Sequence, residues 1–338
     1  MSPIIFLIVL LSTNVYLYGD ESLGGANQLA LLFSGALSAI IGIKYKIYWK
    51  DIIEGVSNSI KSITPSIILL LLIGSLAGTW LISGIVPSMI YYGLQLLNPK
   101  IFLFATALIT AIVSLVTGSS WSTIATIGIA LLGIGEALGL STGLIGGAII
   151  SGSYFGDKLS PLSDTTNLAP AMAGTDLFTH IRYMMYTTIP SFSIALILFL
   201  IIGFNFSSNG TQNIDSLLNT LSSTFNITPW LFLVPIIVVF LIIKKVPAIP
   251  SLMIGTILGS IFAIIFQPNI IMDITDDTSV NLTSSYLAVI NSMSSEVSII
   301  TDNDKLNKLL TSGGMYGMLN TIWLIICAMI FGGILEVT

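Results

Sequence analysis

Long stretches almost free of charged residues are the feature that most restricts the fold of this chain. They include 67–73, 101–116, 189–202, 231–243 and 322–330. Each belongs to a window of about 16 to 22 residues, close to the roughly 20 that an α-helix needs to cross about 30 Å of hydrocarbon. Inside a bilayer every backbone amide and carbonyl needs a partner, and a helix supplies these partners internally. We therefore expect an all-α polytopic membrane protein with roughly eight to ten crossings.

The composition excludes several classes of function. Apolar residues make up 54% and charged residues 8% of the chain, against roughly 25% charged residues in soluble domains. The net charge of -5 resides mostly in connecting segments, so we expect no nucleic-acid partner. Cys327, the single cysteine, excludes an intramolecular disulfide or a thiolate cluster. With one histidine and no HExxH pattern we expect neither an enzyme nor a cofactor.

The basic residues suggest an orientation, because cytoplasmic loops of membrane proteins are enriched in Lys and Arg. They cluster after the second apolar segment, beside the central polar segment, and at Lys244 and Lys245. This pattern predicts a cytoplasmic N-terminus and a retained first helix rather than a cleaved signal. The expected helices include 3–18, 26–43, 62–82, the short 86–97, and an interfacial helix at 175–186 followed by a crossing to about residue 204.

A faint internal duplication suggests how the crossings are organised. LAGTWL at 76–81 resembles IFGGIL at 330–335, and each ends a long apolar run. The two runs are expected to cross in opposite directions, as in the inverted-topology repeats of many secondary transporters. We predict a first transmembrane repeat at 1–204, an external loop at 205–228, and an incomplete second repeat at 229–338. The first repeat would carry an ion-site segment at 117–170.

Two glycine-containing segments are expected to interrupt helices within the first repeat. TGSS at 117–120 and GIGE at 133–136 lie inside otherwise apolar stretches. Discontinuous or re-entrant helices present carbonyls and helix ends to an ion in the middle of a membrane. Ordinary packing of small residues is the alternative interpretation of the first segment.

The central segment 151–170, SGSYFGDKLSPLSDTTNLAP, carries the predicted chemistry. Asp157 and Asp164 lie among hydroxyls, glycines and prolines, and oxygen donors at this density suit a hard cation. A carboxylate near apolar neighbours avoids the cost of a bare buried charge by binding either a proton or a metal cation. A site that takes H⁺ or Na⁺, but not both, couples their gradients. The alternative interpretation is that this segment is a solvated loop without a binding role.

Na⁺ is therefore predicted at Asp157 and Asp164, with neutral oxygens around it. The candidate donors are Ser160, Ser163, Thr165, Thr166 and Asn167 from the same segment, with Thr117, Ser119 and Ser120 from the first break. Three further residues are given accessory roles. Lys158 would pair with an aspartate when the ion leaves, Glu136 is either a proton carrier or a helix-end residue, and Glu336 would approach the site from the last helix.

The residues just described resemble those of the NhaC family of sodium/proton antiporters, whose relatives include malate/lactate exchangers. The resemblance rests on GSYFGDKLSPLSDTTNLAP at 152–170, TGSSWST at 117–123 and IICAMIFGGILE at 325–336. It implies a carrier of the ion-transporter type that exchanges Na⁺ against H⁺, with Asp157 and Asp164 as the matching acidic positions. Family members are usually longer than this chain.

Three functions stay open at this point. The leading one is Na⁺/H⁺ exchange in the cell membrane, with Li⁺ as another possible cation. The second is Na⁺/H⁺-coupled exchange of a small carboxylate such as malate or lactate, and the third is a membrane subunit or fragment that does not transport by itself. The expected surroundings are the lipid bilayer and, as one option, further copies of the chain in a homo-oligomer.

Overall fold

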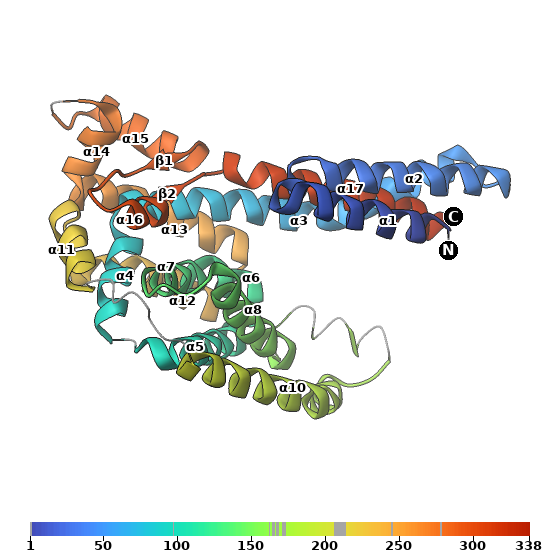
Figure 1. Cartoon of the computed structure of the whole chain (residues 1–338), viewed down its shortest axis with the longest axis horizontal. Helices are drawn as coiled ribbons and strands as arrows, with labels where there is room; N and C mark the ends of the chain where they lie inside the picture. Colours follow the sequence, from blue (N-terminus) through green and yellow to red (C-terminus); the bar gives the residue numbers. More distant parts are fainter. Residues whose placement is uncertain are drawn as a thin grey trace. The chain divides into compact units, whose positions relative to one another are not determined.

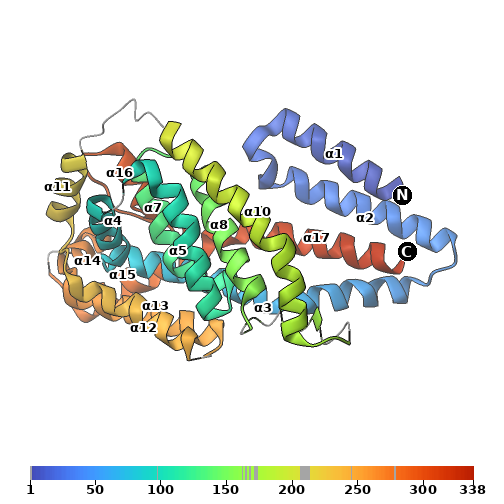
Figure 2. The same cartoon turned by 90° about the horizontal axis from the view of Figure 1, so that it is seen from below.

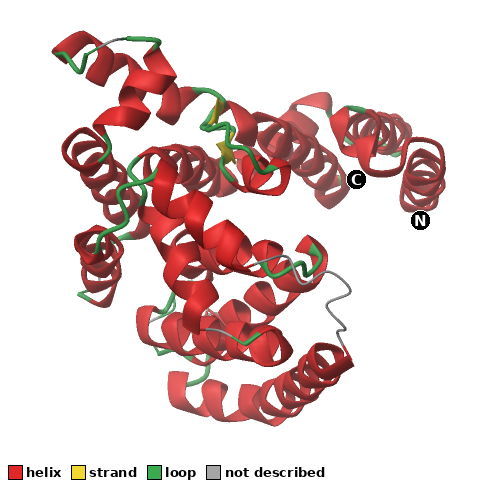
Figure 3. Ribbon diagram, turned by 60° about the vertical axis from the view of Figure 1, so that its left-hand side comes forward, coloured by secondary structure: helices red, strands yellow, loops and turns green. Residues whose placement is uncertain are grey.

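The computed structural model describes residues 2–96, 98–161, 163, 166, 169–170, 174–205, 214–244, 246–277 and 279–338. Helices account for most of them, and two short strands are the only other regular elements drawn (Figure 3). Over this part of the chain, seven helices are long and apolar enough to cross a membrane, or up to eight if the bent pair 215–224 and 229–243 forms one crossing. The all-α, multi-pass prediction is confirmed, with seven or at most eight candidate crossings in the described residues where eight to ten were expected.

The chain divides into two compact units, Met1–Leu71 with Met315–Thr338, and Leu72–Gly314. The boundary falls within the long helix α3 (Trp49–Ile82). The first unit contains α1 (Ser2–Tyr18), η1 (Gly19–Gly24), α2 (Ala26–Lys44), the first part of α3, η5 (Tyr316–Met318) and α17 (Leu319–Val337).

Within the first unit, α2 packs against both α1 and α17. Ala39, Ile52 and Ile334 form a buried apolar cluster that joins α2, α3 and α17. The backbones of α3 and α17 approach closely at Gly55 and Gly333, where a Cβ on Gly55 would come within 2.7 Å of the Gly333 carbonyl oxygen. Small residues at such contacts let membrane helices pack closely.

The second unit begins with the end of α3 and holds the remaining elements. Its first half comprises α4 (Ile85–Leu96), η2 (Pro99–Ile101), α5 (Phe102–Thr117), α6 (Ser120–Thr123), the π-helix η3 (Ile124–Gly128), α7 (Ile129–Ala137), α8 (Thr142–Leu159) and α10 (Leu177–Asn205). Its second half comprises α11 (Ile214–Thr224), η4 (Pro229–Phe232), α12 (Leu233–Ile243), α13 (Ala248–Phe266), α14 (Pro268–Thr275), α15 (Leu282–Ser294), β1 (Val297–Ser298), α16 (Asp304–Leu309) and β2 (Thr311–Ser312), with β1 antiparallel to β2.

Helices α5, α8 and α10 lie side by side in the second unit (Figures 1 and 2). Gly152 and Gly156, four residues apart on one face of α8, permit the contact with α5. A Cβ at position 152 would overlap the Ala107 carbonyl oxygen, and one at position 156 would overlap the Ala111 carbonyl oxygen. This GxxxG spacing therefore holds the polar end of α8 against the end of α5.

The expected helix break at 133–136 is wrong, because α7 is helical through Ala137 and the chain turns after it. The glycines instead make room for neighbouring side chains. A Cβ on Gly133 would lie 2.8 Å from Ile90, and one on Gly135 would lie 2.7 Å from both Ile145 and Phe102. Close packing offsets the modest helix cost of a glycine.

Three other predicted boundaries change. The interfacial helix at 175–186 and the crossing after it form one helix, α10, which includes Pro190. The crossing expected at 62–82 begins earlier, at Trp49. The segment 205–228, predicted as a loop, contains α11, which buries Leu217 and Leu221 on one face. The inverted repeat over 1–204 and 229–338 stays a prediction.

Candidate ion site

A break between two helices forms the first part of the candidate site, as the TGSS segment predicted. α5 ends at Thr117, and Gly118 follows with φ 70° and ψ 19°. This left-handed conformation favours glycine and redirects the chain. Ser119 is extended and its hydroxyl accepts a hydrogen bond from the Ser122 amide at 3.2 Å, so it caps the next helix. The carboxyl end of α5 thus lies beside the amino end of the helical stretch 120–137.

The two helix ends at this break carry opposite partial charges. The carboxyl end of α5 is partially negative and its last carbonyls suit a cation, whereas the amino end of α6 favours a carboxylate. Hydroxyls line the junction, with Thr117 and Thr123 in contact at 3.4 Å between their Oγ1 atoms. Thr123 also donates to the Ser119 carbonyl oxygen at 2.9 Å. The junction therefore gathers oxygen atoms at an interruption of a membrane-spanning stretch.

Asp157 reaches this break from α8. The Ser120 hydroxyl donates a hydrogen bond to Asp157 Oδ2 at 2.9 Å. Ser120 is only 3% exposed and Asp157 is half-buried. The structure thus brings together an acid and a hydroxyl that the sequence assigned to separate segments. A freely solvated position for Asp157 is excluded by this contact and by its burial.

The chain after α8 folds back on the end of that helix. The Thr166 hydroxyl donates to the carbonyl oxygens of Asp157 at 3.0 Å and Lys158 at 3.3 Å. The Ser160 amide donates to the Asp157 carbonyl and the Ser163 amide to the Ser160 carbonyl, each at 3.3 Å. Ser160, Ser163 and Thr166 are buried. These contacts support the backbone that carries Asp157. Asp164, Thr165 and Asn167 lie outside the described residues.

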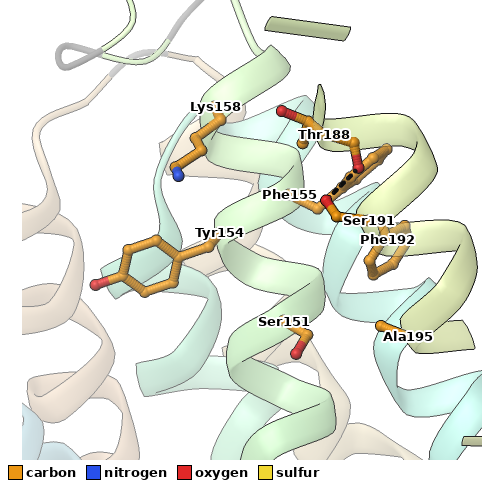
Figure 4. A pocket seen from close by; sticks show the side chains of 8 residues that line it. All are labelled: Ser151, Tyr154, Phe155, Lys158, Thr188, Ser191, Phe192 and Ala195. Atoms are coloured by element: carbon orange, nitrogen blue, oxygen red, sulfur yellow. Dashed lines mark hydrogen bonds between the residues drawn. The ribbon is translucent and has the colours of Figure 1, made fainter. Parts of the chain in front are cut away.

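Lys158 and Tyr154 extend from one side of α8, while Phe155 lies on the α10 side (Figure 4). Both Lys158 and Tyr154 are exposed, and both line a pocket of about 270 Å³ between α8 and α10. Phe155 stacks on Phe192 of α10 with ring centroids 4.1 Å apart. Lys158 therefore offers a positive charge next to Asp157 in the chain and is one of the residues that line a pocket with two stacked aromatic rings.

Glu136 is not brought to Asp157. Its Oε1 accepts a hydrogen bond from the Thr142 hydroxyl at 2.6 Å, and Thr142 begins α8. At 1.5 Å per residue the start of α8 lies roughly 22 Å from Asp157 along the helix axis. Glu336 belongs to the first unit, where it is exposed and lines a pocket of about 290 Å³ with Asp51 and Glu54.

No group of three or more His, Cys, Asp or Glu side chains gathers as a metal site within the part of the chain that the structure describes. Among the described residues, the oxygen atoms that the structure places near the Asp157 carboxylate belong to hydroxyls and backbone carbonyls. Such ligands suit a hard cation. The broken helix supplies atoms of this kind in the immediate neighbourhood of the carboxylate.

Comparison with known proteins identifies the family. Residues 152–338, more than half of the chain and including Asp157, match the Na⁺/H⁺ antiporter family. The chain belongs to the Na⁺/H⁺ antiporter family. As its motifs indicated, it is a membrane antiporter by family and not an enzyme. No solved structure matches this antiporter chain.

Several curated antiporters are similar over almost the whole chain. The malate-2H⁺/Na⁺-lactate antiporter of Bacillus subtilis is 40% identical, covering 98% of this chain and 67% of the relative. The Na⁺/H⁺ antiporter NhaC of Alkalihalophilus pseudofirmus is 37% identical, covering 89% of this chain and 62% of the relative. The arginine/ornithine antiporter ArcD of Halobacterium salinarum is 32% identical, covering 99% and 66%. The chain thus spans about two thirds of the length of these antiporters.

Proposed function

We propose that this antiporter chain exchanges Na⁺ against H⁺ and that Asp157 is the group for which the two ions compete. The contact between Ser120 and Asp157 at the broken helix is the observation that carries the proposal. It places a half-buried carboxylate near the carboxyl end of α5. The terminal carbonyls of α5 and the Thr117 hydroxyl are suitable ligands for a cation there. The family relationship to NhaC antiporters supports the choice of ions.

Competition for one carboxylate is sufficient for coupling. The Asp157 carboxylate is half-buried, and either a proton or Na⁺ can neutralise its charge. Because each excludes the other, a site that opens alternately to the two sides of the membrane carries Na⁺ one way and H⁺ the other. The gradients of Na⁺ and H⁺ across the membrane then set the direction of net exchange.

The proposed location is the cytoplasmic membrane, with the N-terminus inside. Two observations support this orientation. Lys44, Lys46 and Lys50 lie around the connection between α2 and α3, whereas the segment before α12 carries Asp215 and no lysine or arginine. Short loops rich in basic residues stay in the cytoplasm.

Replacing the carboxylate tests the proposed site directly. We expect Asp157→Asn to abolish Na⁺-dependent proton flux in everted vesicles, because an amide binds neither a proton nor Na⁺ in the way a carboxylate does. Asp273→Asn, at an exposed position of α14, is the matched control and should exchange normally. Undiminished exchange by Asp157→Asn at equal expression would refute the assignment.

Small-carboxylate exchange is the second candidate function. Two observations favour it, the 40% identical malate-2H⁺/Na⁺-lactate antiporter and the presence of Lys158, which follows Asp157 in the chain, in the lining of the α8–α10 pocket. A substrate carboxylate would pair with the lysine while the coupling ions use the aspartate. Proteoliposomes loaded with labelled malate or lactate separate the two functions. Exchange that requires an organic anion supports the second, and Na⁺/H⁺ exchange in its absence supports the first.

A further inference from the structure

The hydroxyl of Ser153 on α8 is buried and has no hydrogen-bond partner. Ser153 is 0% exposed, and its Oγ is unpaired among the described residues. Buried polar atoms usually find a partner, because an unmade hydrogen bond costs stability. A helical serine can satisfy itself on a carbonyl of the preceding turn, as Thr110 on α5 does with the Thr106 carbonyl at 2.8 Å. Ser153 does not do so.

The register of α8 shows which way Ser153 faces. Ile149, Ser153 and Asp157 are four residues apart and therefore share one face of the helix. Ile149 packs against Gly128 at the end of η3, and Asp157 accepts from Ser120 at the start of α6. Ser153 lies between these two contacts, so it faces the stretch 120–128 that starts at the ion-site break.

The segment opposite Ser153 departs from regular α-helix. Residues Ile124–Gly128 form a π-helix, whose wider turn replaces the usual hydrogen-bond spacing. Such turns are uncommon and are frequently found at functional sites. A second irregularity of the helical stretch 120–137 therefore packs against α8 at Ile149, about two turns along the helix from the Ser120–Asp157 contact.

We propose that Ser153 Oγ is a ligand of the alkali cation that Asp157 binds, which gives the otherwise unpaired hydroxyl its partner. The inference rests on the proposed function of Asp157 as the ion site. Residues four apart on a helix have Cβ atoms about 5–6 Å apart, so a serine and an aspartate at this spacing can contact one ion. A neutral hydroxyl oxygen is a suitable ligand for a hard cation.

Removing the Ser153 hydroxyl tests whether the residue is an ion ligand or only a packing residue, because the two roles predict different results. As a ligand, Ser153→Ala should weaken the apparent Na⁺ affinity about tenfold, in proton flux and in the Na⁺-dependent rise of Tm in detergent. Its Tm without Na⁺ should be equal to or above that of the wild type, since an unpaired buried polar atom is lost. Ser141→Ala, at an exposed position just before α8 whose side chain makes no capping hydrogen bond, should resemble the wild type in Na⁺ affinity.

A second substitution keeps the test decisive if the alanine variant folds poorly. Ser153→Cys preserves the size of the side chain but offers a soft sulfur that is a poor ligand for Na⁺. It should therefore reproduce the loss of Na⁺ affinity. Wild-type Na⁺ affinity in either folded variant overturns the role of Ser153 while leaving Asp157 in place. Normal exchange by Asp157→Asn instead overturns the proposed function, and this inference with it.

Discussion

At the scale of single residues, the Ser120 hydroxyl holds the Asp157 carboxylate at the helix break. A single hydrogen bond of 2.9 Å from a buried donor fixes one carboxylate oxygen at the amino end of the stretch 120–137. Hydrogen bonds to charged groups contribute about 1.5–3 kcal/mol, more than neutral ones. The second carboxylate oxygen accepts no hydrogen bond from the part of the chain that the structure describes, and in the proposed function it contacts the cation or takes the proton.

Ser120→Ala should weaken Na⁺-dependent exchange without abolishing it. We expect the apparent Na⁺ affinity to fall by about tenfold, because the carboxylate must be ordered without its donor. Ser120→Thr keeps the hydroxyl and should stay close to the wild type. The measurement is the Na⁺ concentration for half-maximal proton flux in everted vesicles. An alanine variant with wild-type affinity would show that Ser120 does not orient the ion-binding group.

At the scale of elements, the contact between α5 and α8 sets the distance from the broken helix to Asp157. Gly152 and Gly156 allow the two backbones to approach, and the Ser114 hydroxyl donates to the Ser153 carbonyl across this interface at 2.5 Å. Membrane helices are joined by close packing and interhelical hydrogen bonds rather than by a hydrophobic driving force. Any separation of α5 from α8 therefore moves Asp157 away from Ser120.

Gly152→Ala should destabilise the protein and reduce exchange together. The new methyl group would overlap the Ala107 carbonyl oxygen, a backbone atom that moves only with its helix. Overpacking of this kind costs about 1–3 kcal/mol. Thermal unfolding followed by size-exclusion chromatography in detergent measures the change. Gly147→Ala, in the same helix with open space around the added Cβ, is the matched control and should be neutral or slightly stabilising.

Asp176 gives α10 a stability that depends on pH. Its carboxylate accepts hydrogen bonds from the Phe178 and Thr179 amides at 3.0 Å each, just before the first turn of the helix. The hydrogen bond from the Thr179 side chain, followed by those two amides, lowers the pKa of Asp176 below its ordinary 3.8. A lowered pKa contributes stability above the ordinary value, and this contribution is lost as the pH falls through the folded-state pKa.

Asp176→Ala should therefore be less stable than the wild type at neutral pH, with the difference shrinking as the pH falls below 3.8. Asp176→Asn retains a capping side chain that does not titrate, so its advantage over alanine should be independent of pH. Chemical unfolding followed by circular dichroism across this range provides the comparison. A constant difference between wild type and alanine would exclude the carboxylate as the source of the pH dependence.

At the scale of the whole molecule, the alternation of apolar helices and charged connections determines the topology. The proposed orientation places the α2–α3 connection in the cytoplasm and α11 outside, which requires an odd number of crossings between them. Among the described residues, four helical stretches between them are long and apolar enough to cross, so the orientation needs one further crossing, by α4 or α8. The single cysteine, Cys327, is buried, which makes labelling of introduced cysteines straightforward to interpret.

Membrane-impermeant maleimide should distinguish the two sides in a Cys327→Ser background. Tyr48→Cys, at a position 77% exposed, should react only in everted vesicles. Asp215→Cys, at an exposed position in α11, should react in intact cells. The reverse pattern would invert the proposed orientation, and labelling of both positions from one side would show that an even number of crossings separates them and contradict the orientation.

The sequence by itself determined the helical, membrane-spanning character and the break at 117–120. These depend on local chemistry, namely the apolar content of each window and the left-handed conformation that Gly118 adopts readily. It also made Asp157 a candidate ion-binding residue, because ionisable side chains in or near membrane-spanning segments are rare and costly. The family resemblance extended this to the expected ions.

Only the tertiary structure decided which glycines break helices and which groups meet. Gly118 turns the chain, whereas Gly133 and Gly135 accommodate Ile90, Ile145 and Phe102 inside a continuous helix, a difference that local sequence does not contain. The pairing of Ser120 with Asp157 and the burial of Ser153 likewise depend on how α5, α6 and α8 pack. Contacts between residues far apart in the chain are set by the shapes of whole helix faces, and no single segment specifies them.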